Sequence, residues 1–343
     1  MKTRKIITVG LIIGTLAIGI LSGCGKKEAG GATISTGTTV AKETKVPKEI
    51  KLDYATYNIE SLVLKEKGWV EEEFSKDGTK VTFVQSQGSN KSLEFLKSSS
   101  VDFGSTAGGA ALIAKAKGAP IEGIYIYSKP EWAALVTTKD SPIQSVVDLK
   151  GKKVAATIGT DPYIFLLRAL DEVGLSKDDI EFIPLQHSDG ANALITNQVD
   201  AWAGLDPHIA RVEVENGARL FYRNVDFNTY GFLNVRSDFA KEYPETVERV
   251  IKVYEKAKQW IAENPDEVVT LLEKEAALKK EVAQKQLERT DFTESIPGDN
   301  QKAALIKAAE ILKKEELIPK ETDIEKIVNE LVNGSYASKA ISK

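Results

Sequence analysis

The sequence predicts an α/β fold in which two similar, doubly wound lobes are joined by a two-strand hinge. The first observation is a repeat: the pattern of residues 81–127 recurs at residues 180–222, about 98 residues later. The second is the alternation of short apolar strands with helices, which is typical of a mostly parallel sheet covered on both faces. The third is a pair of extended segments, residues 134–138 and 231–235, where the chain would cross between lobes. Two such lobes place a ligand in the cleft between them.

Each lobe is predicted to begin with a strand and to alternate strands with helices. In the first lobe we expect strand 51–57, helix 60–74, strand 80–85, helix 90–97, strand 101–104, helix 109–117 and strand 121–127. In the second lobe we expect strand 153–157, helix 162–173, strand 180–184, helix 190–197, strand 199–203, helix 207–216 and strand 220–222.

From Pro244 onward the apolar residues follow a helical period, and we assign these helices to the first lobe because the chain has already crossed back. Further helical stretches are expected around residues 281–289, 301–313 and 323–332. The expected domains are therefore a leader at 1–23, a tether at 24–48, lobe I at 49–134 plus 232–335, and lobe II at 135–231.

The leader has the features of an export signal. Lys2, Arg4 and Lys5 precede an uncharged apolar run that is too short for a comfortable membrane span. It ends in Leu-Ser-Gly-Cys24, which resembles the lipobox of bacterial lipoproteins and implies that Cys24 is lipidated. The following residues are rich in Gly, Ser, Thr, Ala and Lys without an apolar period, which predicts a flexible tether.

Composition excludes several classes of function. The chain has 343 residues, 42% hydrophobic and 28% charged, which is ordinary globular material. Without the leader it carries 43 basic and 50 acidic residues, a balance of −7, so we expect no nucleic acid as partner. Cys24 is the single cysteine, so the folded part can have no disulfide, thiol catalysis or cysteine metal site.

No catalytic or metal-binding set is found. His187 and His208 are the two histidines, and neither has a second ligand at helical metal spacing. His187, Ser188 and Asp189 are adjacent and cannot converge as a hydrolase triad does. The glycine-rich segment at 104–108 lacks the lysine of a phosphate-binding loop. We therefore expect neither metal nor cofactor, and no enzyme.

Five junctions between strands and helices are made of small polar residues and glycine. In an open parallel sheet these junctions border the ligand cleft, and uncapped helix N–H groups can hold an anion without a formal positive charge. Plain helix capping is the alternative at each junction. Capping is the leading explanation for Asp161 and Asp206, and contact with a cationic group of a ligand is a second possibility for Asp206. The junctions lie at residues 87–90, 105–108, 159–162, 187–190 and 205–207.

Several segments resemble one family, the aliphatic sulfonate-binding proteins of ABC importers, which are related to taurine-, nitrate- and bicarbonate-binding proteins. The resemblance extends from about residue 51 to 298. It is carried by Tyr57-Asn58, 88–91 (GSNK), 102–108 (DFGSTAG), 127–132 (YSKPEW), 159–170 (GTDPYIFLLRAL), 184–187 (PLQH), 200–208 (DAWAGLDPH) and 223–236 (RNVDFNTYGFLNVR).

The resemblance implies a type II periplasmic-binding fold that closes on its ligand and delivers it to a membrane permease driven by a cytoplasmic ATPase. The expected protein is a monomeric, extracytoplasmic lipoprotein, held on the bilayer through Cys24, that captures aliphatic sulfonates or taurine as a sulfur source. Another small anion, such as nitrate or bicarbonate, and an enzyme similar to the desulfinases of this fold remain alternatives. Because a sulfonate stays ionised, its affinity is expected to depend little on histidine titration.

The resemblance and the predicted cleft together suggest the ligand contacts. Ser89, Thr106, Thr160 and nearby N–H groups would hold the sulfonate, with Tyr57 and Trp132 against the alkyl part. The full set of expected ligand-binding residues is Tyr57, Asn58, Gln87, Ser89, Thr106, Ala107, Trp132, Gly159, Thr160, Asp206 and Asn228.

Overall fold

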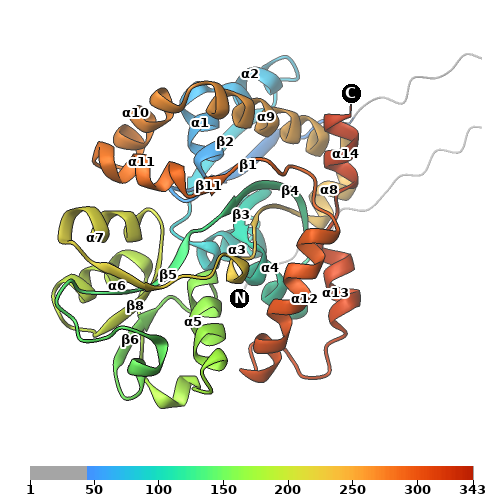
Figure 1. The fold of residues 1–343 in the computed structure, drawn as a ribbon. Helices are drawn as coiled ribbons and strands as arrows, with labels where there is room; N and C mark the ends of the chain where they lie inside the picture. Colours follow the sequence, from blue (N-terminus) through green and yellow to red (C-terminus); the bar gives the residue numbers. More distant parts are fainter. Residues whose placement is uncertain (1–44, 343) are drawn as a thin grey trace, which may run out of the picture. The chain divides into compact units, whose positions relative to one another are not determined.

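The structure, a computed structural model, describes residues 45–342 and contains two β-sheets with helices around them (Figure 1). The leader, Cys24 and most of the tether lie outside the described residues. Within residues 45–342, no helix has the length and apolar character needed to cross a membrane.

The first sheet has six strands in the order β11-β4-β10-β3-β1-β2. Strands β1 and β2 pair in parallel from Glu49 opposite Lys80, and Ile50 and Leu52 of β1 are fully buried. The strands are β1 (Glu49–Tyr54), β2 (Lys80–Gln85), β3 (Phe103–Ala107), β4 (Ile121–Pro130), β10 (Gly231–Arg236) and β11 (Thr290–Asp291).

The second sheet has five strands in the order β7-β6-β8-β5-β9. Strand β6 pairs in parallel with β7 and β8, whereas β5 is antiparallel to β8 and β9. The strands are β5 (Ala133–Thr137), β6 (Lys153–Ala156), β7 (Glu181–Pro184), β8 (Ala201–Leu205) and β9 (Arg219–Tyr222).

The two sheets repeat one strand order, which confirms the duplication in the sequence. Strands β2-β1-β3-β10-β4 of lobe I correspond to β7-β6-β8-β5-β9 of lobe II. In each lobe the fourth strand is antiparallel to both neighbours, and it is the strand next to a crossing between the lobes. Both sheets are otherwise parallel, apart from the short edge strand β11.

The crossings are short connections rather than the extended strands that the sequence suggested. Strands β5 and β10 fall on the expected crossing segments, yet each lies wholly in one sheet. The chain instead crosses between β4 and β5, at residues 131–132, and returns between β9 and β10, at residues 223–230. Lobe II therefore begins two residues earlier than the sequence patterns indicated.

Three helices pack on the second sheet and the others belong to lobe I. Those of lobe II are α5 (Asp161–Glu172), α6 (His187–Ile195) and α7 (His208–Asn216). Those of lobe I are α1 (Ile59–Lys67), α2 (Trp69–Ser75), α3 (Ser89–Lys97), α4 (Gly108–Ala116), α8 (Ser237–Glu242), α9 (Pro244–Glu263), α10 (Pro265–Glu275), α11 (Lys280–Glu288), α12 (Asp299–Lys314), α13 (Ile324–Leu331) and α14 (Ser335–Ile341).

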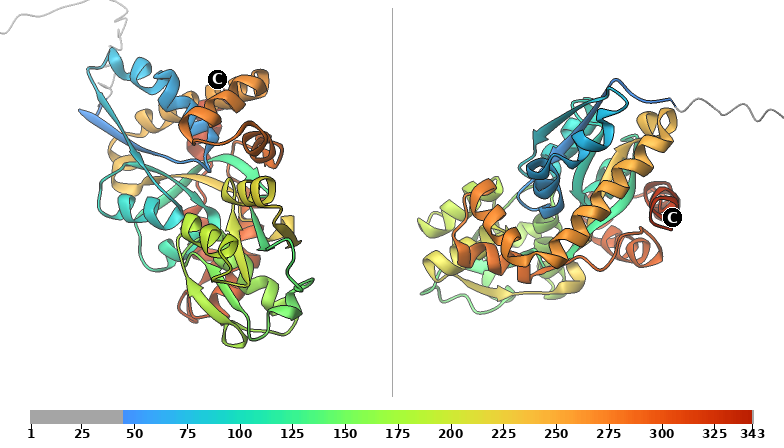
Figure 2. Two further views of the ribbon diagram at one scale, coloured as in Figure 1. Left: turned by 90° about the vertical axis from the view of Figure 1, so that its left-hand side faces the viewer. Right: turned by 90° about the horizontal axis from the view of Figure 1, so that it is seen from above.

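Two helix boundaries differ from the expectation. The single helix predicted at 60–74 is divided at Gly68, whose φ of 65° lies in the left-handed region and ends α1 with an N–H bond to Leu64. The folded part also continues beyond residue 335, because α14 buries Ala337 and Ala340 and packs on α9 (Figure 2).

A buried carboxylate joins the strands of lobe I beneath the cleft. Asp53 of β1 accepts hydrogen bonds at 2.8 Å from Ser86 Oγ and from both the N–H and the hydroxyl of Ser105. The hydroxyl of Tyr57 lies 3.0 Å from Ser86 Oγ, so the same network fixes the Tyr57 ring. Burial raises the pKa of Asp53 to about 6, although these hydrogen bonds favour its charged form.

Replacing Asp53 with Asn is expected to cost more stability at pH 4.5 than at pH 7.5. Because the folded-state pKa of about 6 exceeds an unfolded value of about 3.9, the folded chain binds more protons between those values. The stability that Asp53 contributes therefore grows as pH falls through 6, by at most about 1.4 kcal/mol per pH unit, and Asn cannot follow it. Urea unfolding of both proteins at the two pH values measures the difference.

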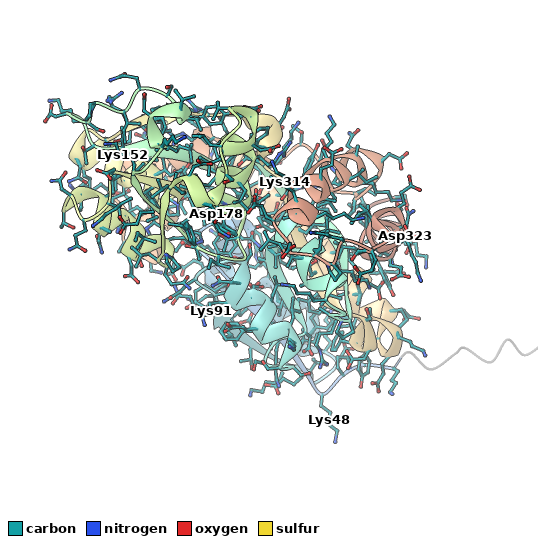
Figure 3. All side chains as sticks on the ribbon, turned by 90° about the horizontal axis from the view of Figure 1, so that it is seen from below. Lys48, Lys91, Lys152, Asp178, Lys314 and Asp323 are labelled. Atoms are coloured by element: carbon teal, nitrogen blue, oxygen red, sulfur yellow. The ribbon has the colours of Figure 1, made fainter. Side chains whose placement is uncertain are left out.

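The exposed residue Asp178 (Figure 3) provides a matched Asp→Asn control on the surface of lobe II. An equal cost of Asp53→Asn at both pH values would contradict the assigned folded-state pKa.

Candidate functional site

A small cavity lies between the two lobes and is lined by both. Its free volume is about 10 Å³, which is room for about one water molecule, so a larger ligand can enter only if the lobes separate. The lining residues are Tyr57, Ser89, Ala107 and Trp132 from the lobe I side and Thr160, Asp161, Pro162, His187 and Leu205 from lobe II.

Helix α3 opens onto this cavity at Ser89. No side chain caps the helix, whose preceding residue is the extended Gly88. Ser89 Oγ accepts a hydrogen bond of 3.0 Å from the N–H of Ala107. Because that bond uses only the oxygen, the hydroxyl hydrogen of Ser89 is free for a ligand acceptor.

Helices α5 and α6 of lobe II also begin at the cavity without a side-chain cap. Thr160 precedes α5, but its hydroxyl donates to the carbonyl of Thr157 at 2.6 Å and so is already used. The N–H of Asp161 is the contribution of this turn to a ligand, because Pro162 has no N–H. Starts of helices from both lobes therefore face one cavity, each with the partial positive charge of a helix N-terminus.

Helix α4 is different, because the connection between the lobes occupies its start. The N–H of Gly109 donates to Thr229 Oγ1 at 2.7 Å, and the N–H of Gly108 donates to the Thr229 carbonyl at 3.1 Å. A Cβ at Gly108 would lie 2.4 Å from that carbonyl, so only glycine permits this approach. In the predicted junction at 105–108, Ala107 lines the cavity, whereas the N–H groups at the start of α4 contact the connection between the lobes.

The carboxylate of Asp161 in lobe II contacts both connections between the lobes. Its carboxylate accepts hydrogen bonds from Trp132 Nε1 at 2.9 Å, from the Thr229 hydroxyl at 2.6 Å and from the Thr229 N–H at 3.1 Å. The prediction that Asp161 caps α5 is therefore wrong, because Asp161 is the first residue of the helix and its side chain turns to the connections between the lobes. Burial raises the pKa of Asp161, against the effect of these donors.

Trp132 and Tyr57 form the apolar wall of the cavity. Their rings meet edge to face at 87°, with centroids 6.5 Å apart, and both side chains are buried. The hydrogen bonds of Trp132 to Asp161 and of Tyr57 to Ser105 O hold the two rings in place.

His187 presents an imidazole nitrogen to the same cavity. Its Nδ1 lies 3.2 Å from Thr157 Oγ1, and its buried Nε2 has no hydrogen-bond partner among the described residues. Burial lowers the pKa of His187 to about 3, with a smaller effect of His208, so the ring is neutral.

A second small cavity adjoins the first and shares Tyr57 and Trp132 with it. Its other lining residues include Asp206 of lobe II and Arg289 of lobe I, whose Nη1 lies 3.2 Å from Asp206 Oδ2. Asp206 also accepts a hydrogen bond of 2.9 Å from the Ala210 N–H in the first turn of α7, although the N-cap residue of that helix is Pro207 and not Asp206 as predicted. Burial raises the pKa of Asp206 to about 6, and Arg289 opposes this rise.

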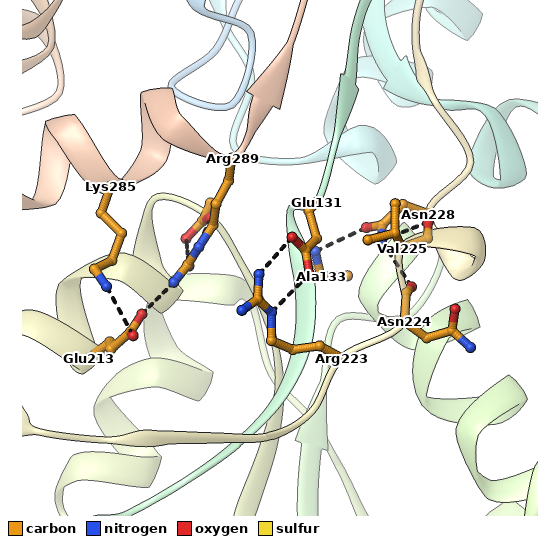
Figure 4. A network of polar contacts seen from close by, with 10 residues as sticks. Glu131, Ala133, Glu213, Arg223, Asn224, Val225, Asn228, Lys285 and Arg289 are labelled. Carbon is orange, nitrogen blue, oxygen red and sulfur yellow. Dashed lines mark hydrogen bonds and ion pairs between the residues drawn. The ribbon is translucent and has the colours of Figure 1, made fainter.

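Charged pairs continue from Arg289 along the contact between α11 and α7. Glu213 of α7 pairs with Arg289 and with Lys285, whose Nζ is 3.0 Å away (Figure 4). We call Asp206, Glu213, Lys285 and Arg289 the cross-lobe clasp. Elsewhere, Lys314 of α12 (Figure 3) pairs with Asp171 of α5, again between the lobes.

The structure brings six of the eleven predicted ligand residues to these two cavities and leaves five outside them. Asn58 donates to Ser105 Oγ, Thr106 accepts from Asn234, and Asn228 accepts from the Ala133 N–H beside the hinge (Figure 4). Gln87 is exposed, and Gly159 forms a turn with φ of 77°. The residues that line the cavities are Tyr57, Ser89, Ala107, Trp132, Thr160 and Asp206.

Sequence reasoning missed four lining residues of the first cavity. Asp161 and His187 lay in the predicted polar junctions but were assigned to capping or to no role. Pro162 and Leu205 are apolar, so their residue types did not indicate a ligand site. They line the cavity because of where the fold places them. In the second cavity Gln286, Arg289 and Thr290 come from the C-terminal region, where the sequence pattern indicated only helix.

A surface groove of lobe I has a much larger volume, about 500 Å³. It lies between α2 and α9 and includes Arg249, Lys252 and Lys256. Arg249 is already paired with Glu73 and Asp77. The groove is large and contains several basic side chains, but helix starts from both sheets meet at the first cavity between the lobes and not at the groove.

The chain is similar to known proteins over most of its length. A model of the family described as "NMT1/THI5 like" matches residues 55–268. A Bacillus subtilis (strain 168) protein with the name "Putative aliphatic sulfonates-binding protein" is 31% identical over 97% of both chains. A protein of the same name from Escherichia coli (strain K12) is 28% identical, over 86% of this chain and 92% of its own.

Solved structures are similar over most of the chain. The alkanesulfonate-binding protein from Xanthomonas axonopodis pv. citri, bound to MOPS, has a TM-score of 0.77 and 24% identity, covering 83% of this chain and 99% of its own. The periplasmic aliphatic sulphonate binding protein from Escherichia coli has a TM-score of 0.72 and 27% identity, covering 82% and 92%. The expected periplasmic-binding fold is confirmed, and the chain belongs to the NMT1/THI5-like family and to the family of the aliphatic sulfonate-binding proteins.

Proposed function

We propose that this protein is the extracytoplasmic substrate-binding component of an ABC importer and captures aliphatic sulfonates, taurine among them, between its lobes. The observation that carries the proposal is the cavity where uncapped starts of α3, α5 and α6 meet beside Trp132 and Tyr57. No Lys or Arg is among the residues lining it, so the donors for an anion are hydroxyl and N–H groups.

These donors are sufficient to hold a sulfonate. Each helix start contributes roughly 0.3–1 kcal/mol toward an anion, and each charge-assisted hydrogen bond contributes roughly 1.5–3 kcal/mol. Three helix starts with several such bonds reach the roughly 8 kcal/mol of a micromolar complex after association costs. The hydroxyl of Ser89 and the N–H groups at the starts of α3, α5 and α6 are the proposed donors.

The second cavity supports a ligand with a tail rather than a bare anion such as nitrate. Tyr57 and Trp132 line both cavities, so an alkyl chain can extend from the sulfonate past the two rings toward Gln286 and Thr290. The two aromatic rings give such a chain apolar surface that a bare inorganic anion could not use.

Delivery of the ligand would need a membrane anchor and a permease. Lipidation at Cys24, after removal of residues 1–23, would anchor the chain to the outer face of a membrane, and residues 24–48 would tether the lobes to it. Closure on the ligand would present a monomer to a permease, which a cytoplasmic ATPase drives. The sulfonate would serve as a sulfur source, and the protein would leave it chemically unchanged.

Calorimetric titration of the chain from residue 25 onward with alkanesulfonates and taurine is expected to show binding, with sulfate and nitrate weaker. Ser89→Ala removes one charge-assisted hydrogen bond to the sulfonate and is expected to weaken binding by roughly 10- to 100-fold. Ser98→Ala, at the other end of α3, removes an exposed hydroxyl and should leave the affinity unchanged.

Absence of heat and of a thermal shift with every sulfonate at millimolar concentration would exclude this function. Release of sulfite during incubation would favour a desulfonating enzyme instead.

Arg289→Gln is expected to weaken sulfonate binding by about tenfold or more at pH 8, because it leaves Asp206 charged, buried and unpaired in the closed arrangement. The loss should be smaller at pH 5, where Asp206, with its pKa of about 6, is protonated in either protein. Calorimetry at both pH values measures the two losses.

Lys280→Gln in the same helix is the matched control, since Lys280 is exposed and no ion pair joins it to another described residue. Equal affinity of Arg289→Gln and the native chain at pH 8 would show that the cross-lobe clasp does not contribute to closure.

A further inference from the structure

His187 places an unpaired polar atom in the cavity proposed for the sulfonate. The side chain is 2% exposed, and its Nε2 finds no hydrogen-bond partner among residues 45–342. A Cβ at Gly88, the residue before α3, would lie 3.1 Å from that nitrogen, so Nε2 faces lobe I across the cleft. Buried polar atoms are rarely left without a partner, and one that faces a ligand cavity indicates a ligand contact.

The neighbouring hydrogen bonds determine which nitrogen carries the proton. Thr157 Oγ1 donates its single hydrogen to the carbonyl of Leu185 at 2.8 Å. It can therefore only accept from His187 Nδ1, 3.2 Å away, so Nδ1 carries the hydrogen of the neutral ring. Nε2 then presents a lone pair to the cavity.

A lone pair opposes the binding of a sulfonate, whose oxygens are acceptors only. The same nitrogen becomes a donor if it takes up a proton, and the imidazolium then contributes both a charge and an N–H to the anion. The first cavity contains no Lys or Arg to provide that charge. A proton on His187 would supply the single formal positive charge in this site.

We propose that His187 is a ligand-binding residue whose Nε2 takes up a proton when the sulfonate binds, so that binding of the anion and binding of a proton are coupled. The inference rests on the proposed function, since the anion occupies the first cavity. It replaces the expectation that histidine titration has little effect on affinity.

The other groups that face His187 do not provide the same effect. His208 of α7 and Asp161 of α5 are titratable groups of lobe II, and Tyr57 of lobe I lines the same cavity. From lobe I, the amide of Asn90 approaches with its Oδ1, which is also buried without a partner. An Asn90 amide turned to donate its Nδ2–H would satisfy Nε2 without a proton, and that arrangement predicts an affinity independent of pH.

The direction of the pH effect follows from the two states of the ring. In the closed arrangement without an anion the pKa of His187 is about 3, so Nε2 is unprotonated throughout the range from pH 5 to pH 8. A bound anion raises that pKa, because the opposite charge favours the imidazolium. Affinity therefore increases as pH falls below the pKa of the bound form, by up to about tenfold per pH unit. Asp206 lies outside the first cavity, and its titration is common to the native protein and to His187→Gln.

Calorimetric titration of the chain from residue 25 onward with an alkanesulfonate, at pH 5.5 and at pH 8, tests the proposal. Repeating it in buffers with different ionisation enthalpies counts the protons taken up. We expect tighter binding at pH 5.5 and uptake that approaches one proton per sulfonate bound. His187→Gln keeps a side-chain N–H donor but cannot titrate, so it should bind without this uptake, and its affinity should depend less on pH than that of the native protein.

His208→Gln is the matched control, because His208 is the other histidine of the chain and does not line the cavity. It should retain the proton uptake of the native protein. Sulfonate binding by the native protein with no proton uptake, or uptake that persists in His187→Gln, would overturn this proposal and leave the sulfonate function intact. Failure of every sulfonate to bind would instead overturn the proposed function.

Discussion

The main constraint on the cleft is that helices from both sheets begin at one narrow cavity with their first N–H groups uncapped. Helix α3 approaches from lobe I and α5 and α6 from lobe II, and no side chain caps any of them. Such groups need a partner, and a closed cleft removes water from them. An anion between the lobes is the partner that their partial charges favour, so we expect ligand binding and lobe closure to occur together.

The charged side chains between the lobes form hydrogen bonds and ion pairs within the protein instead of being free to hold a ligand. Asp161 accepts hydrogen bonds from Trp132 and Thr229, and Arg289 pairs with Asp206 and Glu213. These contacts hold one lobe against the other and fix the rings that would border an alkyl chain. Because Arg289 is held in these pairs, it does not line the first cavity. His187 is therefore the lining residue that could carry a positive charge there.

The sequence predicted the two lobes and the succession of strands and helices along the chain, because the apolar period and the duplicated pattern are local signals. It located Ser89 and Thr160 for the same reason, since small polar residues follow the strands. It could not show that Thr229 blocks the start of α4, or that Asp161 turns away from its own helix, because both depend on contacts between distant segments. Arg289 lies 83 residues from Asp206, and only the packing of α11 on α7 brings them together.

The position of the bound anion would show whether the opposed helix starts hold it. A crystal structure with 3-bromopropanesulfonate would locate both ends of the ligand, since bromine and sulfur scatter anomalously. We expect the sulfur between Ser89 and His187, at the starts of α3, α5 and α6, and the bromine beside Trp132 toward the second cavity. A sulfonate on the basic groove of Arg249 and Lys252, with the cavity between the lobes unchanged, would contradict the account.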